Sequence, residues 1–176
     1  SSFLPEASAI YWAALGLEKA RENPTKVKAD ELIQLRRSIY QSMQLAFQRG
    51  KLISDPYTRT FEFGPNLDIV DKVSASYEQV MQDEPNMRSN IETAHRNFLG
   101  NAVYFLYAND RIPEALKWFR VIGEKYPNKN LLSGRPETTP GNITLEEFCL
   151  GRIVEDVSET SRDRVTAILV GHARTG

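Results

Sequence analysis

Cysteine is almost missing from this sequence, because Cys149 is the only one. A single cysteine excludes an intramolecular disulfide framework and a cysteine-rich zinc site. Long apolar runs are also missing, since none approaches the roughly 20 residues that a membrane-spanning helix needs. Neither sign of charge dominates, and the net charge is −1. Nucleic-acid-binding proteins normally carry a basic excess, so we expect neither a nucleic-acid partner nor a membrane span in this chain.

Helical periodicity is what the sequence has in abundance. Apolar residues recur at spacings of three and four, whereas strict alternation is confined to one short stretch, Thr58 to Phe63. We therefore predict an all-α chain of about seven helices. They run over residues 5–21, 28–49, 67–82, 89–108 and 113–126, from residue 144 onward and from residue 161 onward, and residues 51–65 form a connector.

The stretch 130–142 contains turn-forming glycine and proline and is predicted to be a connector. It separates a helical domain over residues 1–129 from a C-terminal helical pair over residues 143–176, which packs on the first domain or caps it. Thr144 and Glu147 have the spacing of a capping box, so a helix can begin there. That helix is predicted to bury one apolar stripe and to expose its carboxylates. The stripe is Leu145, Phe148, Cys149, Ile153 and Val157, and the carboxylates are Glu146, Glu147, Glu155 and Asp156.

Three residues of the fifth predicted helix follow a pattern that suits packed helix pairs. Ala115 is followed by Phe119 four residues later and by Pro127 after eight more. The small alanine lets two helices cross closely, the aromatic ring fills the space between them, and the proline ends the helix. Tyr77 and Pro85 repeat the aromatic–proline part of the pattern earlier in the chain.

This pattern resembles the tetratricopeptide repeat over roughly residues 9–129, with degenerate copies. The clearest unit is Arg96 to Lys129, although Leu99 and Leu106 stand where the family has its tryptophan and tyrosine. The resemblance implies stacked helical hairpins in an α–α superhelix. A unique helical bundle with chance matches is the alternative. The residues that the resemblance assigns to packing between repeats are Trp12, Leu15, Gly16, Tyr77, Pro85, Ala115, Phe119 and Pro127.

In tetratricopeptide-like domains, the first helix of each pair lines a groove that holds a peptide. The resemblance implies that Asn97, Asn101, Tyr104 and Tyr107 face such a groove. Asparagine both donates and accepts hydrogen bonds, and tyrosine offers a stiff apolar ring with a polar tip. The alternative is that these four side chains pack against the preceding helix pair. The resulting hypothesis is a non-catalytic protein–protein interaction or scaffold module whose partner is a protein or peptide.

Residues that carry chemistry are few. Glu92 and His95 have the Glu-x-x-His spacing of half a di-iron site, but the only other histidine, His172, has Leu169 three residues before it. Cys149 lies in an apolar context that predicts burial. Arg36 and Arg37 are interpreted as a solvated helix face. We find no catalytic constellation and expect no metal or cofactor.

Two further hypotheses accompany the interaction module. One is a structural or assembly segment of a larger protein, and the other is a metal-binding or enzymatic helical bundle. The chain begins Ser-Ser-Phe without methionine, so we expect it to be part of a longer polypeptide. Its composition is typical of a soluble domain, either cytoplasmic or an extramembranous part of a larger protein.

Overall fold

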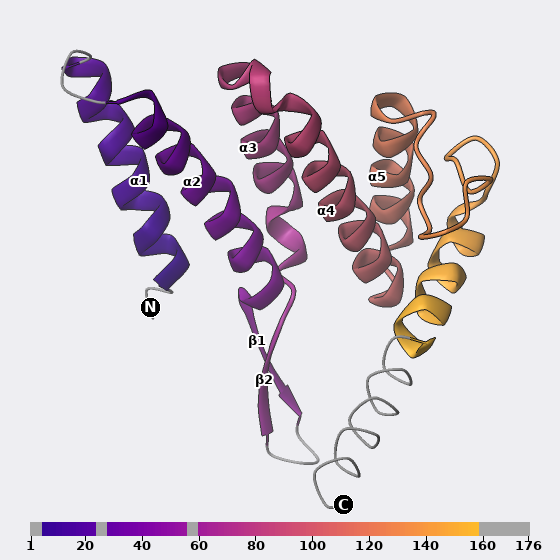
Figure 1. Cartoon of the computed structure of the whole chain (residues 1–176). Coiled ribbons are helices and arrows are strands. Elements are labelled where there is room, and N and C mark those ends of the chain that lie inside the picture. The colour runs from indigo at the N-terminus through magenta and orange to yellow at the C-terminus, as the bar shows by residue number, and fades with distance from the viewer. Residues whose placement is uncertain (1–4, 24–27, 56–59, 159–176) are drawn as a thin grey trace, which may run out of the picture. The chain divides into compact units, whose positions relative to one another are not determined.

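A computed structural model describes residues 5–23, 28–55 and 60–158 of the chain (Figure 1). The chain is all-α in class, and the described residues contain six α-helices rather than seven. The predicted helix from residue 161 lies outside the described residues. The α-helices are α1 Pro5–Glu22, α2 Ala29–Arg49, α3 Val70–Asp83, α4 Arg88–Ala108, α5 Ile112–Lys125 and a helix over residues 145–158. Two short 3-10 helices are η1 Leu67–Ile69 and η2 Pro85–Met87.

A β-hairpin lies between α2 and α3, where the sequence predicted only a connector. Strand β1 Lys51–Asp55 pairs antiparallel with β2 Thr60–Gly64, with Lys51 opposite Gly64 and Asp55 opposite Thr60. The alternating stretch Thr58 to Phe63 was the signal, because aromatic and β-branched residues with a period of two favour strands. The prediction of a connector over residues 51–65 therefore missed these strands, since pairing with β1 cannot be read from so short an alternation.

Contacts between Cα atoms divide the chain into two compact units, residues 1–105 and 106–176. The division falls inside α4 and differs from the boundary predicted at 130–142. That segment is not a free linker, because it packs within the second unit. Leu132 is buried, and a Cβ added to Gly151 would lie 2.3 Å from its Cδ1 atom. The Thr138 hydroxyl accepts from the Leu132 amide at 3.1 Å and donates to the Arg135 carbonyl at 2.7 Å.

Aromatic rings form the core of the first unit. The ring centroid of Phe98 on α4 lies 5.1 Å from that of Phe47 on α2 and 5.7 Å from that of Tyr77 on α3. All three side chains are buried. The Tyr77 hydroxyl donates to Gln44 Oε1 at 2.9 Å, so its polar tip is satisfied inside the cluster. This cluster joins three helices that are far apart in sequence.

Arg36 and Arg37 connect α2 to the end of α3. The Arg36 guanidinium forms ion pairs with Asp83 and Glu84. The Arg37 guanidinium donates to Met87 Sδ at 3.1 Å. The interpretation of these arginines as a solvated helix face is therefore wrong, because the C-terminal end of α3 and η2 lie across this side of α2.

The helices α2 to α5 show a regular alternation of lengths. Helices α2 and α4 have 21 residues each, and α3 and α5 have 14 residues each. The two shorter helices also end alike. The Glu84 amide donates to the Val80 carbonyl at 2.9 Å, and the Tyr126 amide donates to the Ile122 carbonyl at 2.8 Å. A proline follows each of these turns.

The connections within the two long–short pairs differ. The β-hairpin lies between α2 and α3, whereas a tight turn joins α4 to α5. Asp110 adopts a positive φ of 59°, and the Arg111 amide donates to the Leu106 carbonyl at 2.9 Å. This is a left-handed C-cap, which a short polar residue such as aspartate tolerates better than most side chains.

The helix over residues 145–158 starts where its capping signal predicted. Glu147 Oε2 accepts from the Thr144 amide at 2.8 Å, and Thr144 Oγ1 accepts from the Glu147 amide at 3.2 Å. The capping box is therefore confirmed. The Phe148 ring centroid lies 5.9 Å from that of Phe119 on α5, and this contact joins the two helices of the second unit.

Candidate interaction surfaces

The candidate groove residues Asn97, Asn101 and Tyr104 lie on α4 within the first unit. Their spacing puts them on one row of the helix, opposite its buried side. Asn97 is exposed, while Asn101 and Tyr104 are half-buried. The Tyr104 ring centroid lies 5.5 Å from that of Phe105, which holds the aromatic ring against the helix. The buried side consists of Ile91, His95, Phe98, Leu99, Ala102, Val103 and Leu106.

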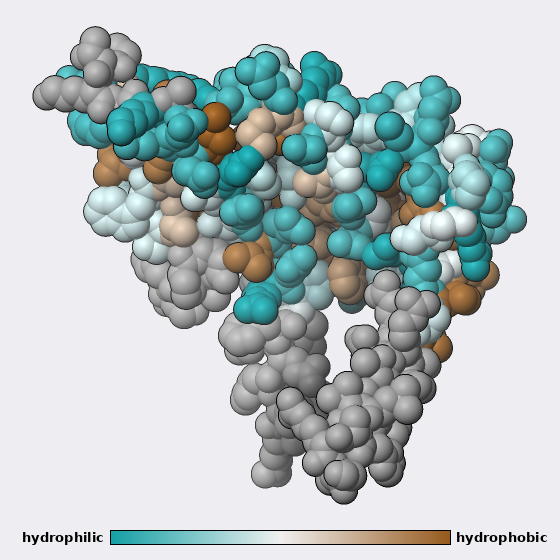
Figure 2. Space-filling model, in the orientation of Figure 1, coloured by the Kyte–Doolittle hydropathy of each residue, from teal (hydrophilic) through white to brown (hydrophobic). Residues whose placement is uncertain are grey.

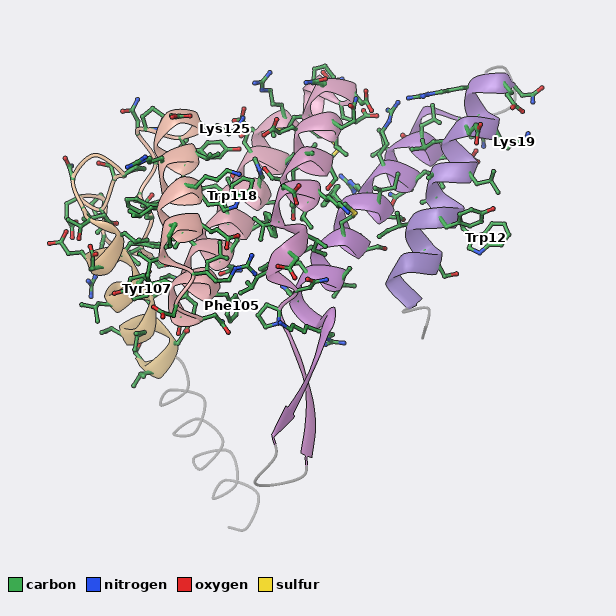
Figure 3. All side chains as sticks on the ribbon, turned by 180° about the vertical axis from the view of Figure 1, so that it is seen from behind. Trp12, Lys19, Phe105, Tyr107, Trp118 and Lys125 are labelled. Carbon is green, nitrogen blue, oxygen red and sulfur yellow. The ribbon has the colours of Figure 1, made fainter. Side chains whose placement is uncertain are left out.

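Tyr107, the fourth candidate, lies beyond the division and belongs to the second unit. It is half-buried near the end of α4 (Figure 3). The structure therefore brings three of the four candidates together on one row of the first unit.

An open depression of about 500 Å³ lies between α1 and α2, and no pattern in the sequence predicts it. Gly16 forms part of its floor because it has no side chain, and a Cβ there would lie 3.2 Å from Leu35 Cδ2. When the ends of α2 and α4 are aligned, Ser38 takes the position of Asn97. The depression thus borders the row of α2 that corresponds to the candidate row of α4. Its lining residues are Gly16, Asp30, Glu31, Gln34, Leu35 and Ser38.

The residues assigned to repeat packing differ in burial. Tyr77 and Ala115 are fully buried. Three more of these residues, Leu15, Gly16 and Phe119, are half-buried. The two prolines, Pro85 and Pro127, are exposed just after helix ends.

Trp12 contradicts the packing prediction, because its side chain is 63% exposed. Figure 3 shows Trp12 and Lys19 extending from the side of α1 that faces away from α2. Ala13 and Ala20 are the buried residues of this helix. The ring instead meets Tyr11 edge-on, at a centroid distance of 5.4 Å. The packing prediction is wrong for Trp12, because alanines rather than the indole face the neighbouring helix.

Glu92 and His95 do not form a shared site. His95 is fully buried, its Nε2 atom is 2.8 Å from Ser74 Oγ, and its ring stacks on Tyr77. Glu92 accepts from Arg88 Nε at 2.9 Å. His172 lies outside the described residues. Within the described part of the chain, no three His, Cys, Asp or Glu side chains gather as a metal site requires.

Two buried acids have raised pKa values. Burial raises the pKa of the Cys149 thiol to about 11, and the nearby Glu146 carboxylate adds to the effect. Burial likewise raises the pKa of Tyr77 well above its ordinary value, and Tyr40 contributes in the same direction. Cys149 is fully buried, as its apolar context predicted. A protonated, buried thiol is a poor nucleophile.

The helix over residues 145–158 departs from its predicted stripe. Leu145, Phe148 and Cys149 are buried, but Ile153 and Val157 are exposed. The prediction is therefore wrong for the last two residues. The inward side continues instead through an ion pair between Arg152 and Glu155, whose nitrogen and oxygen atoms are 3.6 Å apart. Glu155 also accepts from the Ser133 amide at 2.6 Å, so this carboxylate holds the preceding loop instead of facing solvent.

The outward side of this helix is apolar as well. Leu150 and Val154 are exposed beside Ile153 and Val157. Figure 2 shows apolar residues reaching the surface on the helix that Figure 1 draws in yellow. The sequence signal was the spacing of Leu150, Ile153, Val154 and Val157, which puts all four on one side.

Comparison with protein-family models, curated proteins and solved structures finds no match for this chain. Among the described helices, none is long and apolar enough to cross a membrane. Function is therefore inferred from the surfaces themselves.

Proposed function

We propose that this chain is a non-catalytic protein-interaction module of tetratricopeptide-like helix pairs, and that it holds an extended peptide of a partner protein. The observation that carries the proposal is the row Asn97, Asn101 and Tyr104 on α4. The opposite side of α4 is buried, so the helix is fixed, while Asn97 is exposed and Asn101 and Tyr104 are half-buried. A fixed helix presents its side chains with little loss of freedom on binding.

The matching helix lengths support the repeat part of the proposal. A 21-residue helix followed by a 14-residue helix occurs twice, as α2 with α3 and as α4 with α5. In this interpretation the β-hairpin is an insertion in the first pair. Helix α1 then lies before the first repeat pair and is not the first helix of any pair. This agrees with the exposure of Trp12, since the tryptophan of a repeat's first helix would be packed. Repeated pairs stack neighbour on neighbour and offer extended binding surfaces.

The chemistry of the rows suits a peptide with an accessible backbone. The side-chain amides of Asn97 and Asn101 can each donate to a carbonyl and accept from an amide. Tyr104 adds a ring for an apolar peptide side chain. On α2, Asp30 and Glu31 border the depression, so a basic side chain of the peptide is favoured there.

A peptide selected from a random displayed library on the intact chain provides the test. We expect the double variant Asn101→Ala/Tyr104→Ala to bind it about tenfold more weakly, which corresponds to about 1.4 kcal/mol. Fluorescence polarisation with the labelled peptide measures the Kd. Gln79→Ala/Gln82→Ala is the matched control, because it removes two exposed side chains from α3.

Thermal unfolding of each variant separates loss of binding from loss of folding. An unchanged Kd in a folded Asn101→Ala/Tyr104→Ala protein would show that the peptide binds elsewhere. Equal weakening by the α3 control variant would also contradict the assignment, since that helix is not part of the proposed row.

A further inference from the structure

The outward side of the helix over residues 145–158 is a second surface, separate from the α4 row and located in the second unit. Leu150 is 61% exposed and Val154 is 56% exposed. Ile153 and Val157 are exposed beside them. We call these four residues the apolar stripe. An exposed, contiguous apolar surface on a packed helix is typical of an interaction site.

Carboxylates border the apolar stripe. Glu146 and Glu147 lie one turn before Leu150 and are exposed. Asp156 is also exposed, but it lies four residues after Arg152, on the row of the inward side. The helix has four acidic residues and a single basic one, Arg152. Arg152 is engaged with Glu155 on the inward side, so the outward side is acidic.

This charge pattern decides between possible occupants. A second copy laid parallel on the stripe would bring the two Glu146–Glu147 ends together, which is unfavourable, and an antiparallel copy would offer these carboxylates no cation, because Arg152 lies on the inward side. An anionic membrane surface is opposed for the same reason. An amphipathic helix whose apolar side is bordered by lysine or arginine matches both the stripe and its charge.

We propose that the apolar stripe binds a basic amphipathic helix of a partner protein, with Leu150 and Val154 at the centre of the contact and Glu146 facing the partner's cations. Apolar contact supplies the affinity, while the carboxylates select the sign of charge and the orientation.

The probe is a synthetic peptide of about 18 residues, long enough to form a helix, with leucines on one side bordered by lysines. With the intact chain, we expect Val154→Lys to weaken binding at least tenfold and Glu146→Lys to weaken it severalfold. The Glu146→Lys variant should also show a smaller loss of affinity with added salt. Leu116→Lys is the matched control, because Leu116 is 38% exposed on α5 and lies outside the stripe. We expect it to leave the Kd within twofold.

Two further peptides complete the design. A peptide with glutamate in place of every lysine should not bind, and a scrambled peptide without an apolar side should not bind. Equal binding of the glutamate peptide, or an unchanged Kd for a folded Val154→Lys protein, would overturn the proposal.

Light scattering without peptide tests whether a second copy of this chain binds the apolar stripe. A monomer at micromolar concentration is the expected result, whereas a dimer that Val154→Lys dissociates would overturn the proposal in favour of self-association. Binding to anionic vesicles that Val154→Lys abolishes would overturn it in favour of a membrane. These tests are independent of the proposed peptide-binding row on α4, because the substitutions Val154→Lys and Glu146→Lys leave that row unchanged. The substitutions Asn101→Ala/Tyr104→Ala likewise leave the stripe unchanged.

Discussion

Helix α4 and the helix over residues 145–158 use apolar residues in different ways. Helix α4 buries its apolar side and presents amides and a tyrosine ring on the other. The later helix is apolar on two opposite sides, and only one of them is buried. Periodicity therefore identifies which sides of a helix are apolar, while neighbouring elements decide which side becomes the core.

The two units also differ inside. The core of the first unit holds polar groups that bind each other, namely Ser74 with His95 and Tyr77 with Gln44. In the second unit, Cys149 is fully buried and follows the buried Phe148 in the chain. A buried polar pair is costly to break, whereas an isolated buried thiol matters mainly when pH forces it to ionise.

We expect the largest change in stability from substitutions on the two sides of the helix over residues 145–158. Leu145 is 3% exposed and Leu150 is 61% exposed. We expect Leu145→Ala to lower the free energy of unfolding by about 2–5 kcal/mol, because it leaves a cavity. Leu150→Ala should change it by no more than about 0.5 kcal/mol. Urea unfolding followed by circular dichroism measures both, and equal losses would show that the outward side is covered in the folded chain.

A smaller effect is expected in the polar core of the first unit. Ser74→Ala removes the hydroxyl that is hydrogen-bonded to His95, and we expect a loss of about 1–3 kcal/mol in unfolding free energy. Ser38→Ala is the matched control, because its exposed hydroxyl donates only to the Gln34 carbonyl of the same helix. Similar unfolding free energies for the two variants would mean that the buried pair adds nothing beyond an ordinary surface hydroxyl.

The smallest effect is a pH dependence that differs between the units. The ordinary thiol pKa is about 9, and folding raises that of Cys149 to about 11. The unfolded chain therefore loses this proton first, and the unfolding free energy falls as pH rises from 9 toward 11. Below pH 9 the thiol is protonated in both states and this contribution to stability is fully present.

Unfolding free energies of the native chain and of Cys149→Ala across this pH range provide the measurement. The substitution should flatten the decline. Tyr77→Phe should flatten it only above pH 10, because the ordinary tyrosine pKa is about 10 and burial raises it. A decline that neither substitution alters would assign the pH dependence to other groups.

Local signals in the sequence predicted much of the fold. The helical periodicity gave the all-α class and helix bounds close to those observed. Thr144 and Glu147 fixed the start of the helix over residues 145–158, because a capping box needs only residues that are three apart. Three of the four candidate groove residues share one row of the first unit for the same reason, since helical spacing alone sets the row.

Tertiary structure decided the features that depend on a distant partner. Arg36 on α2 is covered because it forms ion pairs with Asp83 and Glu84, and Glu84 lies 48 residues later in the chain. Likewise, the predicted connector contains a hairpin because β2 pairs with β1. The depression at Gly16 lies where α1 packs beside α2, with Gly16 close to Leu35.

Helix positions, helix ends and apolar sides could be predicted from local sequence, because they follow from backbone geometry and from neighbours within one or two turns. Tertiary contacts set the exposure of Trp12, the outward position of Ile153 and Val157, and the division of the two units inside α4. These outcomes depend on which elements cover each apolar side, and such contacts join residues that are far apart in the chain.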